Sequence, residues 1–163
     1  MKKNNLKGWG SVAVHSGHQK DPNYAHLTPI YASSTYIFDS AEQGMHRFTG
    51  QEKGYIYGRW GSPSITEAEE KIAALETYGI SLEATAILHA SGMAAITTLL
   101  MSTLSQGDKI LSHFSLYGGT DELVHRILPR FGVSAVIEDL RDLEKAESAL
   151  RKDKSIKMVY LET

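Results

Sequence analysis

Three short segments carry residues whose types and spacing could bind a phosphate group or a flat ring. In the first, at residues 89–95, an apolar run gives way to small residues and then to a helical pattern. The first amides of a helix have no partner inside it and lie at the positive end of its dipole, so this helix start could receive a phosphate, with Ser91 as cap and donor and Gly92 permitting close approach. The same residues also fit an ordinary turn capped by serine, and the pattern alone favours that simpler interpretation.

The other two segments place aromatic side chains next to predicted helix starts. Residues 55–63 include Tyr57, Gly58 and Arg59, in which arginine offers a forked donor for phosphate and tyrosine offers a hydroxyl. A solvated surface loop explains this segment equally well. Residues 115–120 contain Tyr117, whose ring could lie against a planar ligand at the edge of a sheet. On its own, such a tyrosine is more often a packing or turn residue.

The elements that would position these segments become regular after Pro63. Ser64 and Glu67 form a capping-box pattern, which predicts a helix that ends at Gly79. Four apolar runs then alternate with three helical patterns, and this alternation predicts an α/β domain with a parallel sheet between helices. Leucine-rich repeats have a similar period but a leucine signature that is missing here. The runs are 85–89, 109–113, 133–137 and 156–161, and the helical patterns are 92–104, 120–131 and 140–151.

The chain before Pro63 differs in composition and lacks a regular pattern. Residues 1–62 are rich in glycine, proline, tyrosine and serine, and few windows hold a helical or strand period. The aromatic content argues against disorder, because disordered segments are poor in such residues. We therefore expect residues 1–62 to form an irregular arm that packs on another surface, and residues 63–163 to be the first part of the α/β domain. The last apolar run stops where a ligand-binding strand edge would begin, so we expect the natural chain to continue.

Composition excludes several classes of function. The net charge of −2, with no strong basic cluster, gives no reason to expect nucleic-acid binding. There is no cysteine, and His15 and His18 lack the further ligands of a metal site, so no metal is expected. No apolar stretch approaches the roughly 18 residues of a membrane span. We expect a cytoplasmic protein without a membrane partner. Nucleotide-binding glycine motifs are also missing.

Taken in order, the motifs are similar to those of one enzyme family. The chain resembles the Cys/Met-metabolism branch of the fold-type I pyridoxal-phosphate (PLP) enzymes, which includes cystathionine γ-synthase, cystathionine γ-lyase and methionine γ-lyase. The shared phrases are Val14-His15-Ser16-Gly17, Thr28-Pro29-Ile30-Tyr31, Ser34-Thr35-Tyr36, Tyr57-Gly58-Arg59, Ser91-Gly92-Met93-Ala94, Leu116-Tyr117-Gly118-Gly119-Thr120 and Leu161-Glu162-Thr163.

The resemblance implies a role for each candidate residue. Gly92 and Met93, with Ser91 as the helix cap, would bind the PLP phosphate through backbone amides. The Tyr57-Gly58-Arg59 motif would reach the phosphate of PLP held by a neighbouring subunit. Tyr117 would stack on the pyridine ring and could protonate a leaving γ-substituent, and Glu162 would lie beside the ring.

The resemblance also implies a truncated fold-type I PLP-dependent transferase large domain. The family's PLP lysine, ring-nitrogen aspartate and carboxylate-binding arginine all lie beyond the point that matches Thr163, so the chain alone is expected to be inactive. The implied enzyme carries out γ-elimination or γ-replacement on methionine, cystathionine or homoserine-ester substrates, as a homotetramer of active-site-sharing dimers. Three alternatives stay open: a replacement enzyme of the O-acetylhomoserine sulfhydrylase or cystathionine γ-synthase type, a non-catalytic fragment that mediates dimerisation, and a generic phosphate-binding α/β domain.

Three features depart from the family pattern. Ser62-Pro63-Ser64 replaces an Asn-Pro-Thr phrase, and Trp60 is bulkier than the family residue. Gly119 stands where many methionine γ-lyases carry a cysteine, which favours a cystathionine γ-lyase or a synthase slightly over a strict methionine γ-lyase.

Overall fold

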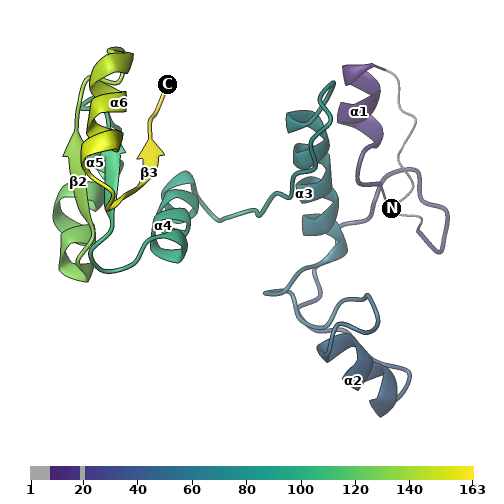
Figure 1. Ribbon diagram of the computed structural model, residues 1–163. Helices are drawn as coiled ribbons and strands as arrows, with labels where there is room; N and C mark the ends of the chain where they lie inside the picture. The colour runs from purple at the N-terminus through teal and green to yellow at the C-terminus, as the bar shows by residue number, and fades with distance from the viewer. Residues whose placement is uncertain (1–7, 19–20) are drawn as a thin grey trace. The chain divides into compact units, whose positions relative to one another are not determined.

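The computed structural model describes residues 8–18 and 21–163. The chain divides into two compact units, of which the first ends at Leu88 and the second begins at His89 (Figure 1). Each unit is built by its own hydrogen bonds and packing. Among the residues described, no helix is both long and apolar enough to cross a membrane.

The second unit contains a parallel sheet, as the sequence predicted. Its strands are β1 (Lys109–Ser112), β2 (Ser134–Ile137) and β3 (Ile156–Tyr160), in the order β2-β1-β3. Both pairings are parallel, and Ile110 of β1 lies opposite Ala135 and Met158. Helices connect the strands, so the expected α/β class with a parallel sheet between helices is confirmed.

The two connections between strands run in opposite directions across the sheet, the first from the central strand β1 to the edge strand β2 and the second from β2 back past β1 to β3. The chain passes from β1 to β2 through α5 (Gly118–Glu122), η1 (Leu123–Ile127) and η2 (Leu128–Phe131), and from β2 to β3 through α6 (Leu143–Lys152). Parallel crossovers are almost always right-handed, so opposite directions place the two sets of helices on opposite faces of the sheet. The hydrophobic core agrees with this placement, because it joins the first set of helices to Ile110 and contains no residue of α6.

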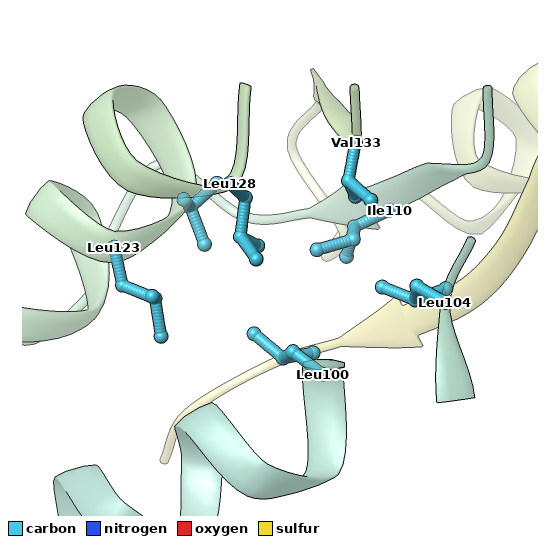
Figure 2. Packing of buried hydrophobic residues seen from close by; sticks show 7 residues of the cluster. Leu100, Leu104, Ile110, Leu123, Leu128 and Val133 are labelled. Atoms are coloured by element: carbon cyan, nitrogen blue, oxygen red, sulfur yellow. The ribbon is translucent and has the colours of Figure 1, made fainter. Parts of the chain in front are cut away.

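The core of the second unit lies between α4 (Gly92–Thr103), the α5–η2 segment and β1 (Figure 2). Leu100 of α4 and Ile110 of β1 are completely buried, and Leu128 is nearly so. Each such side chain contributes about 1.5 to 3 kcal/mol through its removal from water. This packing fixes the start of α4 and the end of β1, which carry two of the candidate segments.

The helix predicted over 120–131 is present but divided into three segments. The α-helical start widens to a π-helical turn at Leu123 and tightens to a 3-10 turn at Leu128. Pro129 explains the change, because its ring has no N–H to donate to the preceding turn and crowds the carbonyl four residues earlier. Gly132 then ends the helix in the left-handed conformation.

The described residues of the first unit form three helices: α1 (Trp9–His15), α2 (Ala41–Phe48) and α3 (Pro63–Glu76). Two of them lie within the segment expected to be irregular. The Ser40 hydroxyl accepts a hydrogen bond from the Gln43 amide, and the Gln43 side chain accepts one from the Asp39 amide at 2.8 Å. This reciprocal cap starts α2 and explains why a helix forms there despite a weak apolar pattern.

Helix α3 begins two residues earlier than predicted. Ser62 caps it by accepting from the Ile65 amide, and Pro63 occupies the first turn, where its missing N–H costs nothing. Ser64 has another partner, because its hydroxyl accepts a hydrogen bond from the Tyr31 amide at 2.9 Å. The Ser62-Pro63-Ser64 phrase therefore starts the helix and ties residues 28–31 to it.

One predicted strand is wrong. Residues 85–89 have no strand pairing within the part of the chain that the structure describes. The Leu88 amide donates to the Glu69 carboxylate of α3 at 2.9 Å. An amide that donates to a side chain is not available for pairing with a neighbouring strand, so this apolar run does not form a strand.

Candidate functional site

The N-terminus of α4 has backbone amides that are open to a ligand. The Ser91 hydroxyl accepts from the Ala94 amide at 3.1 Å, and the Ser91 carbonyl accepts from Ala95. Within the described residues, the amides of Gly92 and Met93 have no hydrogen-bond partner, as expected for the first turn of a helix. A Cβ atom added at Gly92 would meet no atom within 4 Å, so the approach to these amides is clear. They form a suitable cradle for an anion.

The candidate residues of the second unit follow strands β1 and β3. Tyr117 follows β1, and Glu162 follows β3. These neighbouring strands belong to crossovers that run in opposite directions, which makes their carboxyl ends a switch point of the sheet. Ligands bind preferentially at such points in open α/β sheets.

Glu162 joins the two strand ends through three hydrogen bonds. One carboxylate oxygen accepts from the Tyr117 amide at 2.5 Å. The other accepts from the Thr120 hydroxyl at 2.7 Å and from the Tyr160 hydroxyl at 2.8 Å. Thr120 is completely buried. The turn that carries Tyr117 is thus held by a side chain 45 residues further along the chain.

The charge state of this cluster follows from its contacts. The Tyr117 amide, followed by the hydroxyls of Thr120 and Tyr160, lowers the pKa of Glu162, against a smaller opposing effect of burial. Burial, together with the hydrogen bond to Glu162 and its charge, raises the pKa of Tyr160 to about 12. At neutral pH the cluster therefore contains a carboxylate that accepts from a neutral phenol.

The ring of Tyr117 lies over Gly119 and close to Met93. A Cβ atom added at Gly119 would be 2.8 Å from Cε1 of Tyr117 and 3.1 Å from the Met93 sulfur. The Thr120 hydroxyl is 3.8 Å from the same sulfur. The Tyr117 side chain is nevertheless 67% exposed, so much of its ring is available to a ligand. The structure brings Met93, Tyr117 and Glu162 together at one edge of the sheet.

The Tyr57-Gly58-Arg59 motif lies in the first unit and is fixed by local contacts. Tyr57 pairs with Thr35 in an isolated antiparallel bridge, and the Gly58 amide donates to the Ser34 carbonyl at 2.8 Å. The Arg59 guanidinium carbon lies 5.3 Å from the centre of the Tyr57 ring. Within the described residues Arg59 has no carboxylate partner, so its donors remain available for an anion.

Trp60, the bulky departure from the family pattern, has a packing role. Its ring meets Phe48 of α2 edge to face, with 5.6 Å between ring centres. Aromatic pairs of this geometry add about 0.5 to 1.5 kcal/mol beyond their buried area. Trp60 therefore holds the loop that contains Arg59 against α2.

Sequence reasoning missed a second polar cluster at the same edge of the sheet. His113, just after β1, lies 3.2 Å from the Asp139 carboxylate, just after β2. Arg141 donates two hydrogen bonds to that carboxylate, at 2.8 and 2.7 Å, and holds the pKa of Asp139 well below its usual range. His113 ends one predicted apolar run and Asp139 follows the next, but the sequence does not show that these two strands are adjacent in the sheet. Thr120 and Tyr160 were missed as partners of Glu162 for the same reason, since only the fold brings them together. No group of three or more His, Asp or Glu residues suited to a metal ion occurs among the residues placed by the structure.

Comparison with known proteins gives a consistent result. The family model described as Cys/Met metabolism PLP-dependent enzyme matches residues 10–163. The chain is 43% identical to an L-methionine gamma-lyase of Fusobacterium nucleatum over 165 residues, covering 100% of this chain and 39% of that protein. It is 35% identical to an O-succinylhomoserine sulfhydrylase of Pseudomonas aeruginosa, covering 86% of this chain and 34% of that protein.

The fold is similar to a solved structure of the same group. Cystathionine gamma-lyase from Lactobacillus plantarum, complexed with L-serine, superposes with a TM-score of 0.80 at 32% identity, covering 96% of this chain and 37% of that one. The chain thus spans less than two fifths of the length of this structure and 39% of the length of the Fusobacterium relative.

Proposed function

Because the chain belongs to the Cys/Met metabolism PLP-dependent enzyme family, we propose that its protein uses PLP to eliminate or exchange the γ-substituent of sulfur amino acids and related homoserine esters. The observation that carries the proposal is the open, serine-capped start of α4 next to the exposed Tyr117 ring. Such an arrangement suits a ligand with a phosphate at one end and a flat ring at the other. When bound, PLP supplies an electron sink for bonds at the substrate α-carbon.

The residues of α4 fit the phosphate end of this cofactor. Gly92 and Met93 would each donate a backbone amide, and the missing side chain of Gly92 leaves the approach open. Ser91 already accepts from the Ala94 amide, but its own hydroxyl proton is still free to be donated to a phosphate oxygen. The positive end of the α4 dipole adds a favourable interaction with the anion.

Tyr117 fits the ring end. Its ring is largely exposed, and Gly119 leaves room for it beside Met93. We propose that the ring stacks on the pyridine of PLP and that its hydroxyl delivers a proton to the leaving γ-substituent. Glu162, at the end of β3, would lie beside the same ring.

Tyr57, Gly58 and Arg59 are proposed to act across a subunit boundary. In the family arrangement that the sequence implies, they contact the phosphate of PLP in a neighbouring subunit, within a homotetramer of site-sharing dimers. The Arg59 guanidinium has no carboxylate partner among the described residues, which supports an anion-binding role. Residues 1–62 would then be the clasp between protomers.

Subunit sharing can be tested by complementation. Arg59→Ala and Tyr117→Ala should each have little activity alone, because each variant damages every site. Mixed dimers would contain one site with both native residues and one with neither, so activity should reappear after the two variants are unfolded together and refolded. Activity that stays at the level of the separate variants would show that Arg59 and Tyr117 serve the same subunit.

The reaction itself can be tested by its products. The PLP-loaded protein should release a 2-oxo acid from L-methionine or cystathionine, or form a thioether from a homoserine ester and a thiol. The similarity to methionine gamma-lyases supports the first outcome, and the similarity to an O-succinylhomoserine sulfhydrylase keeps the second in view. If neither product forms from any of these substrates, the proposed function is wrong. We place the PLP lysine in the part of the family that this chain does not cover, so these 163 residues alone are expected to be inactive.

A further inference from the structure

Most of the hydrogen-bond acceptor positions of the Glu162 carboxylate are occupied by other groups of the chain. It accepts three hydrogen bonds, from the Tyr117 amide, the Thr120 hydroxyl and the Tyr160 hydroxyl. A carboxylate has about four acceptor positions, so at most one is left for a ligand. Hydrogen bonds to an ionised acceptor are roughly twice as strong as neutral ones, so these contacts restrain the groups that donate them.

Two of the three donors bracket a pair of glycines. Tyr117 and Thr120 flank Gly118 and Gly119. The Glu162 carboxylate accepts from the backbone amide of Tyr117 and from the side-chain hydroxyl of Thr120. Gly118 and Gly119 open helix α5, and glycine is a weak helix former with the widest conformational freedom of any residue, so this first turn has little stiffness of its own. Gly119 also cannot be stiffened by a side chain, because a Cβ there would be 2.8 Å from the Tyr117 ring. The hydrogen bond from the Asp121 amide to the Tyr117 carbonyl restrains this turn from within, and Glu162 adds a restraint from outside it.

We propose that Glu162 is a positioning residue, whose carboxylate clamps residues 117–120 and thereby holds the Tyr117 ring in place over Gly119. This inference rests on the role proposed for Tyr117, although the clamp itself requires neither cofactor nor substrate. Thr120 and Tyr160 complete the clamp by holding the second carboxylate oxygen. Because Thr120 is completely buried, water cannot readily replace the bond that it donates.

Hydrogen–deuterium exchange of the purified protein tests the clamp. Glu162→Gln keeps the size of the side chain and one acceptor oxygen but loses the charge, and Glu162→Ala removes both. Amides in peptides that cover residues 115–121 should exchange roughly tenfold faster in the Ala variant, with the Gln variant intermediate. Glu147→Gln is the matched control, since it makes the same change at a carboxylate of α6 that pairs with Arg151 and takes no part in the clamp; its exchange over residues 115–121 should stay close to that of the native protein.

The Gln variant keeps the test valid if the Ala variant does not fold. Unchanged exchange at 115–121 in a folded Gln variant and in a folded Ala variant would overturn the proposal, and so would an increase spread evenly over the whole chain. In the PLP-loaded protein, the Gln variant should lower kcat at least about fivefold with KM changed less than twofold, because ring placement and not substrate binding is affected. Exchange is measured without substrate, so a positive result there with no catalysis in the native protein would refute the proposed function and leave the clamp intact.

Discussion

Replacement of Ser91 separates the capping of α4 from its proposed binding of phosphate. Asparagine and aspartate cap helices about as well as serine does, and Ser91 is exposed, so either side chain can be accommodated. The two replacements have nearly the same shape and differ by one negative charge. Ser91→Asn and Ser91→Asp should therefore give similar fold stability but different affinity for PLP.

The size of the difference follows from the geometry. Two unit charges 4 Å apart interact by about 1 kcal/mol in water and about 4 kcal/mol at the surface of a protein. A phosphate group carries about 1.5 to 2 negative charges at neutral pH. If the phosphate is held by Gly92 and Met93, the adjacent Asp should weaken PLP binding at least about tenfold relative to Asn. Both variants should unfold within about 0.5 kcal/mol of the native protein, whereas Ser91→Ala should lose about 1 kcal/mol.

Equilibrium titration with PLP, followed by absorbance, measures the affinity, and urea unfolding measures the stability. Titration with inorganic phosphate as a competitor shows whether the charge acts on the phosphate end. Equal PLP affinity of the Asn and Asp variants, with both folded, would refute a phosphate site at the start of α4.

Three further outcomes are expected. Gly119→Ala should displace the Tyr117 ring, since the new Cβ would be 2.8 Å from Cε1, and should lower kcat/KM about tenfold while PLP loading is retained; a crystal structure of the variant would reveal the shift. Leu100→Ala should cost about 2 to 5 kcal/mol in urea unfolding, because Leu100 is completely buried in the core. The pKa of Asp153 is lowered to about 2, mainly by the Lys109 side chain, so the stabilising effect of this carboxylate should be complete above about pH 4 and disappear as the pH falls through about 2. Lys109→Met should raise the Asp153 pKa, which NMR titration measures.

The sheet of the second unit was predictable because its signals are local. Apolar runs at 109–113, 133–137 and 156–161 became β1, β2 and β3 in a parallel arrangement, and the helices between them followed their own periodicity. The run at 85–89 has the same apolar character but lacks strand partners among the described residues. Strand formation depends on pairing as much as on composition, and composition alone does not report a partner.

Helix starts were predictable only in part, and at α3 two serines compete for the cap. Ser62 and Ser64 both precede an apolar pattern. The sequence favoured Ser64 as the cap, because Glu67 completes a capping-box pattern with it. Pro63 decides the outcome, since it is suited to the first helical position and therefore makes Ser62 the cap. The start of α2 was visible as Ser40 followed by Gln43, but its weak apolar pattern gave no reason to look for it.

The candidate site shows the same division between local and distant information. Ser91, Gly92 and Tyr117 were identifiable because each lies in a short phrase at the end of a predicted element. The bond between Tyr117 and Glu162 joins residues 45 positions apart, and nothing in either phrase indicates it. It depends on β1 and β3 being neighbours in the sheet, which only the fold establishes.

The central claim is that the protein containing this chain holds PLP covalently at the edge of the sheet where α4 begins. The most direct measurement is the denaturing intact mass of the natural protein after loading with PLP and reduction with borohydride. The account predicts one phosphopyridoxyl group per polypeptide in the native protein, and markedly less in Ser91→Asp under the same limiting PLP concentration. An unmodified polypeptide from folded, PLP-treated native protein would contradict it.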